Sequence, residues 1–117
     1  MRVLVVEDEV LLALDLTEML RSLGHDVVAS AATLEDGLKR IDDSSFDVAI
    51  VDVNLNGSTS EPIAERLSEN GVRCILATGY ASANLPSALA GYPLLDKPYN
   101  IDELERTLSA IGSKMKS

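Results

Sequence analysis

Residues 46–54 read FDVAIVDVN, and this stretch decides the fold class. Its apolar run begins at Phe46, is interrupted by Asp47 and ends on Asp52. Near-continuous hydrophobic runs of this length are typical of strands that are buried on both faces of a parallel sheet. We therefore predict a strand from Phe46 to Asp52, with a carboxylate at its carboxyl end.

Four further apolar runs repeat this pattern at intervals of 20 to 26 residues, which leaves room for one crossover helix between successive strands. Five such βα units fold most simply into an open parallel sheet with helices on both faces. We predict an α/β protein, a flavodoxin-like (βα)5 three-layer sandwich whose parallel five-stranded sheet has the order 2-1-3-4-5. The predicted strands are Arg2 to Val6, Asp26 to Ser30, Phe46 to Asp52, Val72 to Ala77 and Pro93 to Asp96.

Helical periodicity and helix-end residues occupy the segments between these strands. Thr33 and Asn100 are expected N-caps, and Glu103 is expected to complete a reciprocal cap at the last helix. We expect the tail after Gly112 to be frayed. The predicted helices run from about Glu9 to Leu23, from just after Thr33, from about Ser60 to Asn70, from about Asn84 to Ala90 and from just after Asn100.

The composition excludes several classes of protein. A chain of 117 residues with 46% hydrophobic residues has the size and apolar content of one domain, and we expect a single domain over residues 1–117 with no output domain. A net charge of −9 opposes nucleic-acid binding, so no direct nucleic-acid partner is expected. The longest apolar stretch, Val10 to Leu14, is too short to cross a membrane, which predicts a cytoplasmic protein without a membrane partner. Cys74 is the single cysteine, and its apolar neighbours indicate a core thiol.

Three carboxylates are expected at one edge of the predicted sheet. The first strand leads into Glu7 and Asp8, and its neighbour in the predicted order ends on Asp52. Taken alone, Glu7 and Asp8 could be acids that favour a helix N-terminus, and Asp52 could be a turn residue. Two like charges about 4 Å apart repel by roughly 4 kcal/mol at an effective dielectric of 20, so the cluster needs a cation. Clustered oxygen ligands suit a hard divalent ion, and we predict Mg²⁺ or Mn²⁺ here.

Two further strands add a hydroxyl and an amine to the same edge. The fourth strand leads into Thr78 and Gly79, where a phosphate could lie beside a residue without a side chain. The fifth strand leads into Lys97, which on its own would be an ordinary solvated lysine. Together with the three acids these groups supply a nucleophile, metal ligands, a hydrogen-bond donor and a charge clamp. This combination indicates phosphoryl transfer.

These residues resemble the receiver domain of two-component response regulators, and the match covers essentially the whole chain in the right order. The resemblance implies that Asp52 is the phosphoacceptor, Thr78 the switch hydroxyl and Lys97 the clamp on the phosphoryl group. It also implies a cis bond between Lys97 and Pro98. The metal ligands that it implies are Glu7, Asp8, Asp52 and the backbone carbonyl of Asn54.

The chain departs from the common receiver pattern at two places. Leu94 stands where many receivers have an aromatic residue three positions before the lysine. In those receivers the aromatic side chain reorients with phosphorylation. Coupling of such a side chain to Thr78 is therefore in doubt for this chain. The run from Leu76 to Tyr80 is similar to the F-A-T-G motif of the FAT-GUY group of stand-alone receivers, and Tyr80 is a candidate modulator of hydrolysis. Residues 53–57, VNLNG, lack the proline that many receivers have after the phosphoacceptor, so we expect a different and looser loop.

The resemblance implies a sensor histidine kinase as partner, a phosphotransfer protein as a further candidate, and a monomer or weak dimer. The downstream role could be that of a phosphate sink, a relay or an allosteric regulator. Three other functions fit the sequence less well. An aspartyl-nucleophile phosphatase would need a D-x-D-x-T stretch, and a nucleotide or flavin module would need a glycine-rich loop; neither motif is present. A degenerate receiver that binds partners without phosphorylation is disfavoured by the intact acid, threonine and lysine set.

Overall fold

The computed structural model describes residues 1–79 and 85–116 of the chain. Five strands pair in parallel in the order β2-β1-β3-β6-β7, which is 2-1-3-4-5 when only these strands are counted along the chain, as predicted. Each strand begins and ends within two residues of its predicted limits. The strands are β1 (Arg2–Val6), β2 (Asp26–Ala31), β3 (Val48–Asp52), β6 (Arg73–Thr78) and β7 (Leu94–Asp96).

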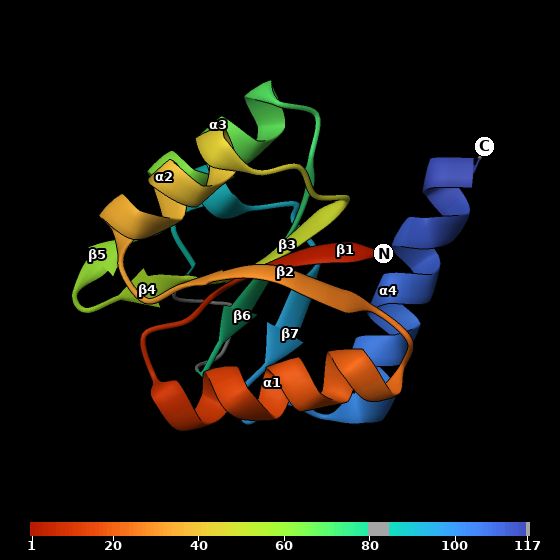
Figure 1. The fold of residues 1–117 in the computed structure, drawn as a ribbon. Helices are drawn as coiled ribbons and strands as arrows, with labels where there is room; N and C mark the ends of the chain where they lie inside the picture. Colours follow the sequence, from red (N-terminus) through yellow and green to blue (C-terminus); the bar gives the residue numbers. More distant parts are fainter. Residues whose placement is uncertain (80–84, 117) are drawn as a thin grey trace.

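Helices cover both faces of this sheet and complete the predicted flavodoxin-like three-layer sandwich (Figure 1). One face carries α1 (Val10–Ser22) and α4 (Ile101–Lys116). The opposite face carries α2 (Leu34–Asp43), α3 (Glu61–Glu69) and the short 3-10 helix η2 (Ser87–Leu89). Within residues 1–79 and 85–116, no helix combines the length and the apolar character that a membrane crossing requires.

The central strand β3 divides the interior into two cores. All five of its residues are buried, because it has a strand on each side and helices above and below. Successive side chains of a strand point to opposite faces. Ala49 and Val51 therefore pack with the α2 and α3 side, whereas Val48 and Ile50 pack with the α1 and α4 side. This two-sided burial explains why the strand reads as a continuous apolar run.

The predicted helix caps hold in part. The Oγ1 of Thr33 accepts the N–H of Asp36 at 3.1 Å, and the Oδ1 of Asn100 accepts the N–H of Glu103 at 3.0 Å. The predicted reciprocal cap, in which the Glu103 side chain reaches back to the start of its own helix, was wrong. The Glu103 carboxylate instead accepts the N–H of Asp96 at 2.9 Å. Glu103 thus ties the first turn of α4 to the end of β7.

Three local predictions need correction. The described part of the predicted helix 84–90 is the 3-10 helix η2, which begins after Pro86; Asn84 lies outside the described residues. The segment after Asp52 is a short antiparallel hairpin, β4 (Asn54–Leu55) paired with β5 (Ser58–Thr59), where we expected a loose loop. The last helix continues past Gly112 to Lys116, where we expected a frayed tail.

The buried centre of β3 yields a stability prediction. Replacing Ile50, which is 1% exposed, with alanine should lower the free energy of unfolding by about 2 to 5 kcal/mol, because the change leaves a cavity between β3 and the α1 side. Urea denaturation measures the loss. Leu11, 78% exposed on α1, is the control, and its alanine variant should stay within about 0.5 kcal/mol of the wild type. Equal losses in the two variants would contradict this arrangement of the core.

Candidate functional site

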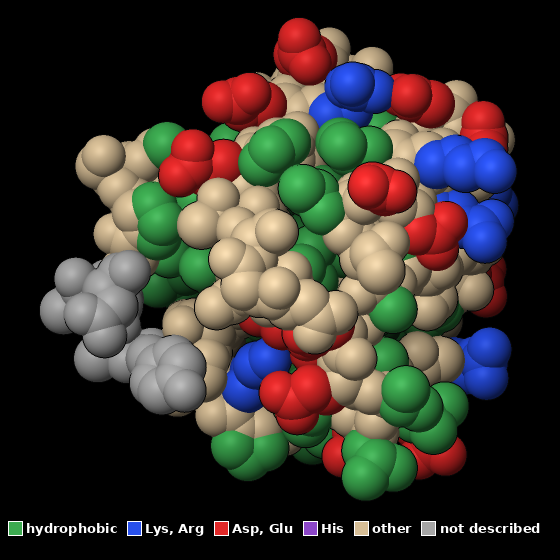
Figure 2. Space-filling view, turned by 90° about the vertical axis from the view of Figure 1, so that its left-hand side faces the viewer, with side chains coloured by type: hydrophobic (Ala, Val, Ile, Leu, Met, Phe, Trp, Pro, Cys, Tyr) green, Lys and Arg blue, Asp and Glu red, His purple; other side chains and the backbone are tan. Residues whose placement is uncertain are grey.

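The predicted site residues meet at the edge of the sheet where β1, β3, β6 and β7 end. A hollow of about 600 Å³ opens there, and it lies on the face of the molecule drawn in Figure 2, where acidic and basic side chains come together. Predicted residues in its lining are Asp8, Asp52, Asn54, Thr78, Gly79 and Lys97. Parallel strands place all their carboxyl ends on one edge of the sheet. Residues as far apart in the sequence as Asp8 and Lys97 therefore reach a common site without any special loop.

The three predicted acids form a compact group. Glu7, Asp8 and Asp52 each offer a carboxylate oxygen, and these oxygens lie within 4.8 Å of one another. Glu7 and Asp52 are buried, at 3% and 4% exposure, while Asp8 is half-buried. Asp8 and Asp52 line the open hollow, whereas the Glu7 side chain is fully buried. A group of three hard oxygen donors fits the ligand preference of Mg²⁺, which keeps several of its own waters. The donor set therefore fits the predicted metal.

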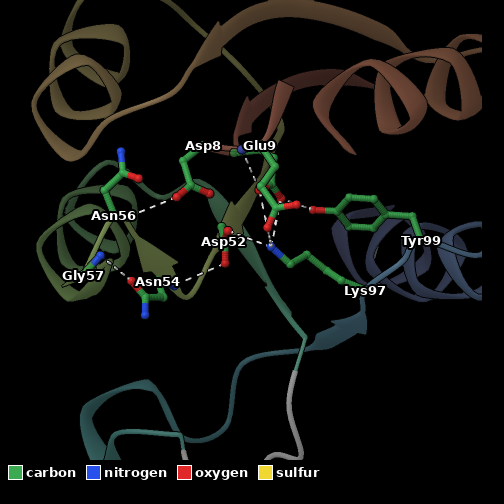
Figure 3. Close-up of polar contacts among 9 residues, drawn as sticks. Asp8, Glu9, Asp52, Asn54, Asn56, Gly57, Lys97 and Tyr99 are labelled. Atoms are coloured by element: carbon green, nitrogen blue, oxygen red, sulfur yellow. Dashed lines mark hydrogen bonds and ion pairs between the residues drawn. The ribbon is translucent and has the colours of Figure 1, made fainter. Parts of the chain in front are cut away.

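Lys97 supplies a cation to this group. Its Nζ lies 2.8 Å from Asp52 Oδ2 and 3.3 Å and 3.4 Å from the two oxygens of Glu7, and it lies 3.9 Å from Glu9 Oε1. Figure 3 shows the lysine side chain reaching in between these acids. The ammonium group is positioned to hold the buried carboxylates together.

A functional contact that sequence reasoning missed comes from Tyr99. Its hydroxyl donates a hydrogen bond to Glu7 Oε2 at 2.8 Å, and the Glu9 N–H donates to Glu7 Oε1 at 3.2 Å. Burial and the Glu7 carboxylate raise the pKa of Tyr99, so the hydroxyl keeps the proton that it donates. An aromatic residue two positions after Lys97 was visible in the sequence, but its partner depends on how β1 and α4 pack.

The β4–β5 hairpin closes the other side of the group. The Asn54 N–H donates to Asp52 Oδ1 at 3.2 Å, and the Asn56 N–H donates to Asp8 Oδ2 at 3.0 Å. The Asn54 side chain accepts the N–H of Gly57 at 2.8 Å, which braces the turn (Figure 3). Asn56 and Gly57 both have positive φ, at 52° and 87°, and Asn-Gly is the preferred pair for such a two-residue turn. This dipeptide was the signal that could have predicted the hairpin.

The remaining predicted residues lie near the site in different ways. Thr78 ends β6 and pairs with Asp96, and its backbone carbonyl accepts the Lys97 N–H at 3.0 Å. The Lys97–Pro98 bond is cis, as expected. Leu94 pairs with Leu76 and packs against the core on the α2 and α3 side, away from the acid group. Tyr80 lies outside the described residues.

Burial and neighbouring charges shift the pKa values of Asp52, Asp8 and Lys97, and not all in the same direction. Burial raises the pKa of Asp52 to about 7, despite the opposing hydrogen bond from Lys97. Partial burial alone would raise the pKa of Asp8, but the Asn56 N–H and the contacts with Asp52 and Glu7 lower it overall. Burial opposes the charge on Lys97, yet the hydrogen bond to Asp52 and the charges of Asp52 and Glu7 raise its pKa, so the lysine stays protonated.

Comparison with known proteins agrees with this geometry. Residues 3–109 match the family model of the response regulator receiver domain, and the chain belongs to this family of two-component signalling switches. The resemblance inferred from the sequence is thereby confirmed.

Individual relatives share both fold and sequence. The solution structure of SdrG from Sphingomonas melonis Fr1 superposes with a TM-score of 0.84 at 35% identity and covers 94% of each chain. The response regulator PhyR from Brucella abortus superposes at 0.80 with 30% identity over 92% of this chain and 46% of that one. The two-component response regulator PhoP of Pseudomonas aeruginosa is 31% identical over 95% of this chain and 51% of that protein. The chain spans about half the length of the curated relatives it matches.

The raised pKa of Asp52 predicts a pH-dependent stability. In metal-free protein, the stability advantage of Asp52→Asn over the wild type should grow as the pH rises from about 4 to about 7. In this window the folded wild type binds a proton that the unfolded chain has released, and that stabilisation disappears as the pH passes the folded pKa of about 7. Urea denaturation in the presence of EDTA measures the difference.

The matched control is Asp43→Asn at the exposed end of α2, which reports the effect of removing a surface carboxylate. An advantage of Asp52→Asn that is the same at both ends of the window would contradict the placement of Asp52 among buried acids.

Proposed function

We propose that this receiver accepts a phosphoryl group on Asp52 and signals through contacts with other proteins. The observation that carries the proposal is the position of the Asp52 carboxylate. It lies at the centre of an acid group, is held at 2.8 Å by Lys97, and borders an open hollow lined by Thr78 and Gly79. A carboxylate so placed has a cation beside it and space in front of it for a phosphoryl donor.

The proposed transfer is a direct displacement at phosphorus. A carboxylate oxygen of Asp52 forms a bond to the phosphorus of a phosphohistidine, the N–P bond breaks, and the histidine nitrogen leaves with the electron pair of that bond. Glu7, Asp8, Asp52 and the Asn54 carbonyl would hold Mg²⁺, which when bound supplies positive charge to the transferring oxygens. Lys97, already paired with Asp52, would then face the new acyl phosphate and stabilise it.

The switch itself rests on Thr78 and Lys97. Both belong to the β6 and β7 ends, and the backbone bond from Lys97 N–H to the Thr78 carbonyl links them. A phosphoryl group on Asp52 would attract both side chains and shift an existing equilibrium of these segments. The output is a changed surface read by a partner protein, whether the chain acts as a sink, a relay or an allosteric regulator.

An exposed apolar patch beside the site supports a protein as the phosphoryl donor. Val10, Leu11 and Leu14 on the first turns of α1 are 70%, 78% and 56% exposed, and Glu9, directly before them, lines the hollow. Hydrophobic side chains also gather below the charged hollow on the face shown in Figure 2. A histidine kinase that delivers a phosphoryl group to Asp52 has to approach over this edge, and the patch offers apolar area for docking.

The phosphorylation site is tested with acetyl phosphate and Mg²⁺. The wild type should gain one phosphoryl group, and Asp52→Asn should gain none, because Asp52 is the carboxylate that Lys97 holds at 2.8 Å beside the hollow, whereas Glu9, which also lines the hollow, lies 3.9 Å from the ammonium. Intact-protein mass spectrometry measures the label. Asp47→Asn, directly before the opposite end of the same strand, is the matched control and should label like the wild type. Labelling that persists in Asp52→Asn would refute the assignment.

The donor surface is tested with a histidine kinase that phosphorylates the wild type. Leu11→Asp should slow transfer from the kinase about tenfold or more, because it places a charge in an apolar contact. Labelling by acetyl phosphate, which needs no docking surface, should stay near the wild-type rate. Rapid-quench measurement of both reactions gives the comparison. Equal rates of kinase transfer in the variant and the wild type would exclude this patch as the docking surface.

A further inference from the structure

Tyr99 reaches the acid group from the side opposite the hairpin. Figure 3 shows its ring extending toward Glu9 and Lys97 from the start of α4, while Asn54 and Asn56 lie across the site. Its hydroxyl is 2.8 Å from Glu7 Oε2. The ring is buried at 8% exposure in the core formed with α1 and α4, where Leu104 and Leu108 also pack. The hydroxyl is therefore fixed by a rigid, packed ring.

The Glu7 carboxylate depends on few donors. Its side chain is fully buried, so water cannot replace a missing partner, and a buried polar group without a hydrogen bond is unfavourable. Oε1 faces the Glu9 N–H and Lys97, and Oε2 faces Tyr99 and, at 3.4 Å, Lys97. The Lys97 ammonium is shared with Asp52, to which it is bound at the shorter distance of 2.8 Å. Tyr99 is the contact that anchors Oε2.

We propose that Tyr99 is a positioning residue that holds the Glu7 carboxylate in place beside Asp8 and Asp52, so that the divalent-cation site is ordered before the ion arrives. This inference rests on the proposed function, because it assumes that Glu7, Asp8 and Asp52 bind Mg²⁺. The Tyr99 hydroxyl bonds to Glu7, and Tyr99 is not among the residues that line the hollow. Its hydroxyl acts through Glu7, in the way that outer-shell hydrogen bonds orient metal ligands.

Loss of the Tyr99 hydroxyl should therefore lower the affinity for the cation without changing the rate of phosphoryl transfer. Without the hydroxyl, Glu7 has more orientations, and binding the ion must restrict them, which lowers affinity. Once the ion is bound, Glu7 is held by the ion itself. The transfer step at saturating Mg²⁺ should then be unchanged, because the Tyr99 hydroxyl bonds to Glu7 and lies outside the lining of the hollow in front of Asp52.

The test compares Tyr99→Phe with Tyr92→Phe. Tyr92 packs against the core on the opposite face of the sheet, so its variant removes a tyrosine hydroxyl far from the acid group. Mg²⁺ is titrated into each protein and followed by NMR of the backbone amides of residues 7 and 8, without any phosphoryl donor. Tyr99→Phe should weaken Mg²⁺ binding about tenfold, and Tyr92→Phe should leave it unchanged. With acetyl phosphate, the rate at saturating Mg²⁺ should stay within about twofold of the wild type in both.

A double-mutant cycle with Glu7→Ala separates positioning from a general structural effect. Once Glu7 is absent, removing the Tyr99 hydroxyl should cost no further Mg²⁺ affinity. An additive loss in the double variant, or a Tyr99→Phe affinity equal to that of the wild type, would overturn the proposal. Failure of the wild type to bind Mg²⁺ would overturn it together with the metal site. Normal Mg²⁺ binding without phosphoryl labelling would instead refute the proposed phosphoacceptor and leave the positioning role intact.

Discussion

The contact between the Lys97 ammonium and the carboxylates of Glu7 and Asp52 is the interaction on which the site depends. A parallel sheet delivers the ends of β1 and β3 to adjacent positions, so acids at both ends are forced together. Repulsion between such charges is on the order of 4 kcal/mol at close range, and burial adds the cost of removing the carboxylates from water. The lysine is bonded to both acids at once and therefore offsets repulsion that neither acid can escape by moving into water.

The position of Lys97 is set by the backbone on both of its sides. Before it, β7 pairs with β6, and the Asp96 N–H is held by the Glu103 carboxylate from α4. At the residue itself, the Lys97 N–H bonds to the Thr78 carbonyl. After it, Tyr99 is buried between α1 and α4 and contacts Glu7. A side chain with four rotatable bonds is thus anchored on a segment that is fixed at three successive points, which limits where the ammonium can go.

The sequence predicted those features that follow from continuous patterns. The apolar run predicted a strand that ends correctly at Asp52 but starts two residues too early, at Phe46 where β3 begins at Val48. The uninterrupted run from Val48 to Asp52 reflects burial on both faces of the sheet. The convergence of Glu7, Asp52 and Lys97 followed from parallel topology alone. The contact of Tyr99 with Glu7 could not be predicted, because it joins residues 92 positions apart through the packing of α4 against the sheet.

For the hairpin after Asp52 and the short helix η2, the sequence contained a signal that a competing pattern outweighed. The Glu103 contact was missed because a local capping pattern offered a simpler partner. The Asn56-Gly57 pair predicts a tight turn, but residues 53–57 were interpreted against a family loop, and the hairpin was missed. The segment 84–90 has helical spacing, yet Pro86 and Gly91 leave room for only the short η2 in its described part. Glu103 was assigned to its own helix cap because that pattern is local, whereas the edge strand β7 offered the Asp96 N–H at 2.9 Å.

The acid group is held from two flanks, and this division bears on how a signal could spread. The hairpin donates backbone N–H groups to Asp8 and Asp52, while β7 and α4 contribute Lys97 and Tyr99 to Asp52 and Glu7. Asp52 is the one acid of the three that both flanks contact directly in the described part of the chain. A phosphoryl group added there would exchange one carboxylate for a larger, more highly charged acceptor and would change the hydrogen bonds of both flanks together. The hairpin flank is braced by a side chain within its own turn, from Asn54 to Gly57. The lysine flank connects to β6, β7 and α4, so a rearrangement there reaches a wider surface than one in the hairpin.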